Sequence, residues 1–271
     1  MRLLFLGDVM GRAGRDAISD RLPGLIERLR LDFVVINGEN ASHGRGLTEG
    51  HHADLRSAGA DVVTLGDHAF DQRDTLSYIA REEGLLRPLN MPAGTPGRGA
   101  TLIEGRNGHR VLVINALGRV FMQPMDDPFR AVEAAIAACP LGEQADAIVV
   151  DFHTEATSEI QAMGHFLDGK ATLVVGTHTH IPTADNRILK GGTALMADAG
   201  MCGDFDSVIG MEADEPLNRF LTGVAVGRFT PAEGPATLCG VMVETDPRTG
   251  LAVRQGALRV GGSLAETWPD F

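Results

Sequence analysis

The chain has 271 residues, of which 44 % are hydrophobic and 22 % are charged, and its formal net charge is -12. A chain of this length buries roughly three quarters of its unfolded surface, so it needs no disulfide framework or structural metal in order to fold. The negative charge disfavours long nucleic acid as a partner, and no apolar run approaches the ~18 residues of a membrane-spanning helix.

The first residues and the cysteines indicate the cellular compartment. Residues 1–7 place one arginine before a short apolar run and then Asp8, whereas a secretory signal has an apolar stretch of roughly 7 to 15 residues. The cysteines, Cys139, Cys202 and Cys239, are widely spaced and lie outside any CxxC pattern. Such spacing favours neither disulfides nor a thiolate zinc site. We therefore expect a cytoplasmic protein.

Short apolar runs alternate with amphipathic stretches through most of the chain. The apolar runs predict strands at 2–6, 32–37, 61–65, 110–115, 147–152 and 171–175. The amphipathic stretches predict helices at 15–31, 48–58, 74–83, 128–138 and 157–167. After Gly192 the helical pattern fades, and strands are expected at 193–196, 222–229, 236–244 and 251–260. This order predicts a single α/β domain over residues 1–271, with a mainly parallel sheet and an antiparallel tail.

Polar side chains follow five of the predicted strands at their carboxyl ends. In an open α/β sheet, ligands bind in the crevice outside these ends, so the side chains there are expected to converge. Eight candidates occupy such positions: Asp8, Glu39, Asn40, Asp67, His68, His153, His178 and His180.

The chemistry of these candidates indicates a metal centre. Carboxylate oxygens and imidazole nitrogens together suit Mn, Fe or Zn, and their number exceeds what one catalytic ion with an open position needs. Two metal ions about 3.5 to 4 Å apart, bridged by a carboxylate, would use them all, and such a pair stabilises phosphoryl displacement. The residues therefore predict a dinuclear hydrolase of phosphate esters.

The same motifs carry a family resemblance. In order and spacing, Gly7 and Asp8, the GEN at 38–40, the GDH at 66–68, His153 and the GTHTH at 176–180 resemble the calcineurin-like metallophosphoesterases, and within them the YmdB-like bacterial phosphodiesterases. The likeness extends to INALGRVFM at 114–122, DFHTEATSE at 151–159, GTHTHIPTAD at 176–185 and DAGMCGDFDSVIGME at 198–212. It implies a layered β-sandwich flanked by helices, which agrees with the alternating first part and the strand-rich tail.

The resemblance also implies a role for each candidate. One metal ion would be bound by Asp8, Asn40 and His180. The other would be bound by Asp67, His153 and His178. Glu39 would bridge the two ions, and His68 would be the general acid. The metals implied are Fe or Mn, with Zn or Mg as alternatives; the substrates implied are small phosphodiesters, in particular 2′,3′-cyclic nucleotides, and a homo-oligomer is the implied assembly.

Two positions depart from the general pattern of the superfamily. Met10 stands where an Asp-x-His motif would have its histidine, and Asn40 takes over as ligand, in agreement with the closer group. Asp67 replaces the asparagine of a GNH motif. With Asp8, Glu39 and a bridging hydroxide, Asp67 would bring the ligand charge to a value that formally cancels two divalent ions. We therefore expect tight metal binding and weak electrophilic activation of the substrate.

A mechanism follows from these assignments. A hydroxide that bridges the metals would attack phosphorus in line, because coordination lowers the pKa of water. His68 would protonate the departing alkoxide, and Asp71, three residues later, would orient its imidazole. Arg12 and Arg45 lie in glycine-rich loops facing the expected cleft, where they would either contact phosphate or remain solvated.

Several other interpretations fit parts of the pattern. A phosphomonoesterase or protein phosphatase would use the same metal pair, and a regulatory protein would keep the metals with little catalysis. The metal amidohydrolases also use a His-x-His pair, but at their first strand and with a bridging lysine that this chain lacks. Asp8, Glu39 and Asp67 taken singly would suit helix N-caps. The spacing of Gly7, Gly11 and Gly14 is not that of a dinucleotide-binding loop, so no organic cofactor is expected.

Overall fold

Two β-sheets form the centre of the computed structural model, which describes residues 1–271. The first sheet has the strand order β11 (Gly203–Asp204), β12 (Ala236–Thr245), β1 (Arg2–Leu6), β2 (Phe33–Asn37), β3 (Val62–Thr64) and β4 (Leu85–Leu86), and β13 (Ala252–Val260) pairs with β12. The second has the order β5 (Ala100–Glu104), β6 (Arg110–Leu117), β7 (Ala147–His153), β8 (Leu173–Thr177), β10 (Ala194–Met196) and β9 (Arg187–Ile188). Strands β1 to β4 run parallel, as do β6, β7, β8 and β10. The strands of the tail, β12 and β13, are antiparallel to their neighbours, as expected.

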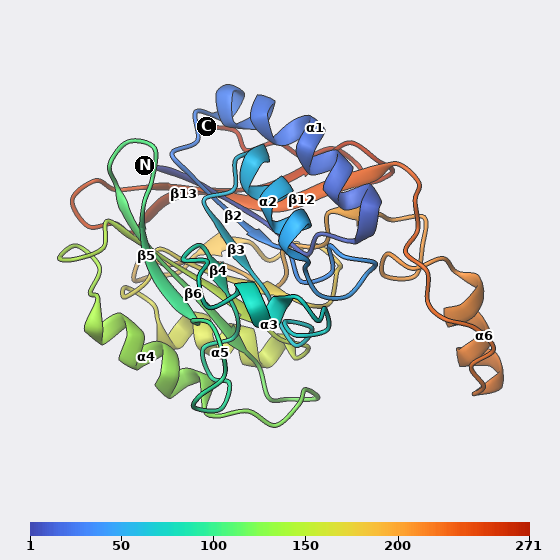
Figure 1. Cartoon of the computed structure of the whole chain (residues 1–271). Coiled ribbons are helices and arrows are strands. Elements are labelled where there is room, and N and C mark those ends of the chain that lie inside the picture. Colours follow the sequence, from blue (N-terminus) through green and yellow to red (C-terminus); the bar gives the residue numbers. More distant parts are fainter.

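Helices cover the outer face of each sheet (Figure 1). Helices α1 (Gly11–Leu29) and α2 (Glu49–Ala58) pack on the first sheet, and α4 (Pro128–Ala138) and α5 (Thr157–Phe166) pack on the second. Asp127 caps α4 by accepting hydrogen bonds from the backbone N–H groups of Phe129 and Arg130. No helix combines the length and the apolar character that crossing a lipid bilayer requires.

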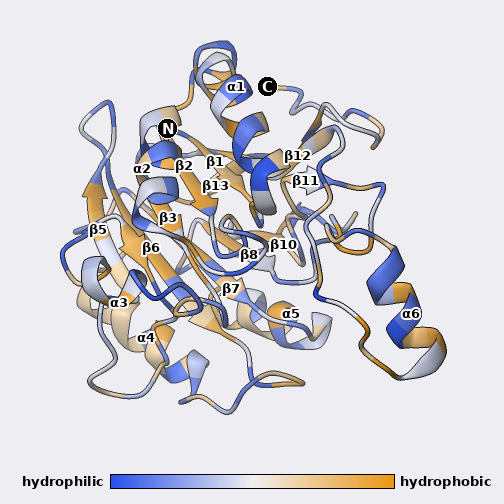
Figure 2. Cartoon of the chain, turned by 45° about the vertical axis from the view of Figure 1, so that its right-hand side comes forward, coloured by the Kyte–Doolittle hydropathy of each residue, from blue (hydrophilic) through white to orange (hydrophobic).

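Both faces of the central strands are buried, because successive side chains of a strand point to opposite sides. Phe5 and Val35 face the second sheet and pack there against Val113 and other apolar side chains. Their strand neighbours, such as Leu4, pack under α1 and α2. The near-continuous apolar runs of the sequence therefore correspond to strands with both faces covered, one by the other sheet and one by helices (Figure 2). The layered β-sandwich flanked by helices is confirmed.

Three expectations about the elements were wrong. The parallel strands are divided between two sheets instead of forming one. The helix expected at 74–83 is reduced to α3 (Thr75–Tyr78) and turns. The strand expected at 222–229 does not form; a helix, α6 (Asp214–Thr222), precedes an irregular segment there. Val224 and Val226 alternate with polar or small residues as in a strand, yet both are exposed, because this segment stands away from the sandwich (Figures 1 and 2).

Candidate metal centre

All eight predicted site residues lie at one edge of the sandwich, where the parallel strands of both sheets end. Strands β1, β2 and β3 bring Asp8, Glu39, Asn40, Asp67 and His68 from the first sheet. Strand β7 ends on His153, and His178 and His180 follow β8 in the second sheet. The site therefore sits between the sheets, and each sheet supplies part of it.

Four of these residues form a compact cluster. Glu39, Asp67, His153 and His178 each offer one ligand atom, and these atoms all lie within 4.8 Å of one another. The Nε2 atom of His153 is 3.0 Å from Glu39 Oε1 and 3.1 Å from Asp67 Oδ1. The Nδ1 atom of His178 is 3.5 Å from Asp67 Oδ1. Glu39 and His153 are buried. The four groups could hold a metal ion.

A second group of potential ligands lies beside this cluster. Asp8 Oδ1 is 3.9 Å from His180 Nε2 and 4.0 Å from His153 Nδ1. His180 donates from Nδ1 to the carbonyl oxygen of Ile209 at 2.7 Å, which leaves its Nε2 lone pair turned toward Asp8. The buried Oδ1 atom of Asn40 has no hydrogen-bond donor. A buried amide oxygen without a partner is costly, and a cation would satisfy it.

A buried hydrogen-bond network around Asp151 orients His153. Asp151, on β7, accepts hydrogen bonds from Thr64, Asn37 and Thr177 at 2.6, 3.0 and 2.7 Å. Because Thr177 donates its proton to Asp151, its oxygen accepts from His153 Nδ1 at 2.8 Å. This arrangement aims His153 Nε2 at the carboxylates, as in carboxylate-supported metal sites. Asp151 was not among the predicted site residues, although a carboxylate inside the apolar strand before His153 is a visible signal in the sequence.

The site concentrates negative charge in a buried volume. Burial raises the pKa of Asp8 to about 7, and the nearby charge of Glu39 contributes to the increase. Burial disfavours a charged His153, but Glu39 and Asp67 raise its pKa well above the ordinary value. An imidazolium at this position is thus the local counter-charge for the carboxylates. A metal ion would displace the Nε2 proton and supply that positive charge itself.

The backbone around the ligands is tightly constrained. His178 and His180 both adopt positive φ angles, 102° and 68°, which are uncommon for residues other than glycine and are often found at functional sites. A Cβ atom on Gly66 would lie 2.1 Å from Glu39 Oε2 and 2.4 Å from His153 Cδ2. Only glycine fits there. The carboxylate, amide and imidazole donors, the unpartnered Asn40 oxygen and this close packing all fit the divalent ions expected from the sequence.

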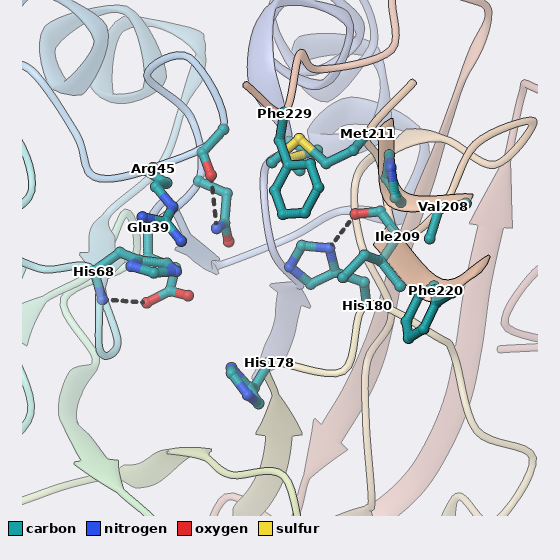
Figure 3. A pocket seen from close by; sticks show the side chains of 14 residues that line it. Glu39, Arg45, His68, His178, His180, Val208, Ile209, Met211, Phe220 and Phe229 are labelled. Carbon is teal, nitrogen blue, oxygen red and sulfur yellow. Dashed lines mark hydrogen bonds between the residues drawn. The ribbon is translucent and has the colours of Figure 1, made fainter. Parts of the chain in front are cut away.

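His68 lies at the side of the cluster and borders an open cavity of about 400 Å³ (Figure 3). Its Nδ1 atom is 3.0 Å from Asp71 Oδ2, and its Nε2 atom is 3.8 Å from Asp67 Oδ2. Its backbone N–H donates to Glu39 Oε2 at 3.3 Å. Arg45 borders the same cavity, whereas Arg12 pairs with Asp16 on the surface of α1. The guanidinium of Arg45 and the imidazole of His68 thus border one cavity beside the ligand cluster.

Comparisons with known proteins identify relatives over nearly the whole chain. A family model described as YmdB-like protein matches residues 4–257. Over 254 residues the chain is 46 % identical to a 2′,3′-cyclic-nucleotide 2′-phosphodiesterase of Bacillus subtilis, and the match covers 94 % of this chain and 95 % of that protein. A crystal structure of a hypothetical protein from Thermus thermophilus is 41 % identical, with a TM-score of 0.89 and coverage of 97 % and 100 % of the two chains. A novel phosphatase from Mycoplasma pneumoniae is 34 % identical, with a TM-score of 0.88 and coverage of 96 % and 93 %. The chain therefore belongs to the YmdB-like family of phosphoric ester hydrolases.

Proposed function

We propose that the chain is a dinuclear-metal phosphodiesterase that hydrolyses 2′,3′-cyclic nucleotides at the 2′ ester bond. The observation that carries the proposal is the buried donor set at the floor of an open cavity, with Asn40 Oδ1 unpartnered beside the cluster of Glu39, Asp67, His153 and His178. The printed name of the Bacillus relative supports this class of substrate.

The ligand assignment divides the donor set into two groups around Glu39. One ion would be held by Asp8, Asn40 and His180. The other would be held by Asp67, His153 and His178. Glu39 would bridge the two ions. In support, its Oε1 lies 3.0 Å from His153 Nε2, and it borders the cavity together with Asn40 and His180. Bound there, Fe or Mn ions, or alternatively Zn or Mg, would activate water and neutralise the phosphoryl oxygens.

His68 is proposed to be the general acid that protonates the leaving oxygen. The Nδ1 atom of His68 lies 3.0 Å from Asp71 Oδ2. In the imidazolium form that acts as the acid, Asp71 would accept the Nδ1 proton and the Nε2 proton would be the one given to the substrate. In the reaction the oxygen of water bonds to phosphorus, the bond between phosphorus and the 2′ oxygen breaks, and Nε2 gives its proton to that oxygen. The attacking water loses one proton to the solvent, and His68 takes up one proton from the solvent before the next turnover. The product is a nucleoside 3′-phosphate. Arg45 borders the same space and would bind a non-reacting phosphoryl oxygen.

A substrate panel combined with metal analysis tests this function. We expect protein purified without added ions to contain about two transition-metal ions per chain. It should hydrolyse 2′,3′-cyclic AMP and bis-p-nitrophenyl phosphate, and it should be slow on the monoester p-nitrophenyl phosphate. A preference for the monoester would support the phosphomonoesterase alternative. Metal-replete protein that hydrolyses none of the three would contradict the proposal.

Asp67→Asn tests the charge argument made from the sequence. The asparagine would remove one negative charge from the cluster, where Asp67 Oδ1 lies 3.1 Å from His153 Nε2. The metals should then bind less tightly and polarise the substrate more strongly. We expect equal or higher turnover at saturating metal, together with a higher metal concentration for half-maximal activity. Turnover that falls at every metal concentration would refute the argument.

A further inference from the structure

The cavity beside the metal centre has two chemically different walls (Figure 3). Its polar wall contains Glu39, Asn40, Arg45, His68, His178 and His180. Its apolar wall, as we call it below, consists of Val208, Ile209, Met211, Pro216, Phe220 and Phe229. The polar wall accounts for binding of metal and phosphate. The apolar wall faces the same cavity, but its side chains carry no charge that could bind a metal ion or a phosphate group.

The fold leaves three residues of the apolar wall exposed. Phe220 is 85 % exposed, Ile209 is 51 % exposed and Phe229 is 39 % exposed. Pro216 and Phe220 lie four residues apart on α6 and so share one helix face, which is turned toward the cavity. Exposed apolar side chains grouped at one site mark a contact with a ligand, another protein or a membrane, whereas scattered single ones need no explanation. Because this group borders the cavity of the metal centre, the contact considered below is one with the substrate.

A strained turn connects this wall to the metal ligands. Val208 and Met211 exchange backbone hydrogen bonds at 2.9 and 3.0 Å, and the two central residues, Ile209 and Gly210, have φ angles of 49° and 90°. Such a turn normally carries Asn-Gly, and a β-branched residue there is strained. The carbonyl oxygen of Ile209 accepts the Nδ1 proton of His180. The turn therefore holds the apolar wall at a set position relative to His180.

Phe229 is held in place from one side. The guanidinium carbon of Arg219 lies 4.0 Å from the centre of the Phe229 ring. Arg219 is itself fixed by Glu215 at 2.7 Å and by the carbonyl oxygen of Gly227 at 2.8 Å. Arg219 borders a neighbouring cavity of about 290 Å³ but not the main one, whereas Phe229 borders both. The Phe229 ring thus lies between the two cavities. Arg219 packs against it on one side, and the side toward the metal centre is available to a ligand.

We propose that the apolar wall is the subsite for the nucleobase of the substrate, with Phe220 and Phe229 as its stacking partners. The inference rests on the proposed function, because the base is attached to the ribose whose cyclic phosphate reaches the metal centre. Stacking on an aromatic ring tolerates every base, since each base has a π-face. The subsite therefore selects nucleotides over phosphodiesters without a base and discriminates only weakly among the four bases.

A pair of substrates that differ only in the base tests the subsite. Metal-loaded enzyme is assayed with 2′,3′-cyclic AMP and with methyl riboside 2′,3′-cyclic phosphate, which carries a methoxy group in place of adenine. For the wild type, kcat/KM should be roughly ten- to a hundredfold higher for the nucleotide, the range expected for stacking of one base. Phe220→Ala and Phe229→Ala should remove most of that advantage through KM and leave the kinetics of the methyl riboside unchanged.

Matched variants separate stacking from other effects. Leu221→Ala removes a side chain that is 76 % exposed and adjacent to Phe220 but absent from the cavity wall, and it should behave as wild type. Phe229→Leu keeps an apolar side chain without an aromatic face, and it should resemble Phe229→Ala. Adenosine alone, followed by saturation-transfer NMR, should bind the wild type and bind Phe220→Ala and Phe229→Ala more weakly.

The possible results separate the subsite from the proposed function. If both substrates are hydrolysed and the phenylalanine variants slow them equally, the subsite is refuted while the phosphodiesterase activity stands. If Phe220→Ala instead changes the oligomeric mass of the protein, the wall is a contact between copies, and the subsite is again refuted. If the wild type hydrolyses neither substrate, the proposed function fails, and adenosine binding still decides whether the base is recognised.

Discussion

Glu39→Gln is expected to lower phosphodiesterase turnover by roughly a thousandfold or more, since metal ions supply several kcal/mol of transition-state stabilisation. Glu39 is buried, and its Oε1 lies 3.0 Å from His153 Nε2. Glutamine has nearly the same shape, so the fold should persist. It lacks the charge that holds two cations together, so bound metal should fall as well. Steady-state kinetics with bis-p-nitrophenyl phosphate and elemental analysis of the same sample measure both effects.

Glu133→Gln is the matched control for this experiment. Glu133 is half-exposed on α4, pairs with Arg130 at 2.9 Å and does not border the cavity of the metal centre. The same change of charge there should leave turnover and metal content as in the wild type. If Glu39→Gln kept both its metal and its turnover, the dinuclear assignment would be wrong. If it lost its activity but kept two ions, Glu39 would act on the substrate instead of bridging the metals.

His68→Gln is expected to lower turnover of 2′,3′-cyclic AMP by roughly a hundred- to ten thousandfold, the usual effect of losing a general acid. Its metal content should remain near that of the wild type, because His68 Nε2 lies beside the ligand cluster, 3.8 Å from Asp67 Oδ2. An alkoxide leaves poorly without a proton, whereas p-nitrophenolate leaves readily. The loss on bis-p-nitrophenyl phosphate should therefore be much smaller than the loss on the cyclic nucleotide.

The dependence on the leaving group separates two roles for His68. Equal losses on both substrates, accompanied by loss of metal, would identify His68 as a ligand and contradict its role as acid. His165→Gln is the control, since His165 is exposed on α5 and away from the cavity; its kinetics should match the wild type. Asp71→Asn should give a smaller loss than His68→Gln, because Asp71 acts through other side chains: its Oδ2 lies 3.0 Å from His68 Nδ1 and 4.0 Å from the guanidinium of Arg45.

The positions of the proposed ligands could be predicted from the sequence because they follow from local structure. Asp8, Glu39 and Asp67 each come directly after an apolar run that forms a strand, and parallel strands of one sheet end at the same edge. The helical spacing at 128–138 matched α4 residue for residue, because that helix buries an apolar stripe against the second sheet. Wherever a segment is packed on the core, its periodicity reports its structure.

Other features depended on tertiary structure alone. The division of the strands between two sheets rests on pairing between distant segments, which apolar runs do not specify. Asp151 became recognisable as a support of His153 only when β7 and β8 placed Thr177 between them. Helix α6 was missed although its sequence contains apolar residues with helical spacing, namely Pro216, Leu217, Phe220 and Leu221. The helix stands away from the sandwich and Phe220 is 85 % exposed. Periodicity indicates an apolar face, but only the tertiary structure shows that this face borders a cavity instead of packing on the core.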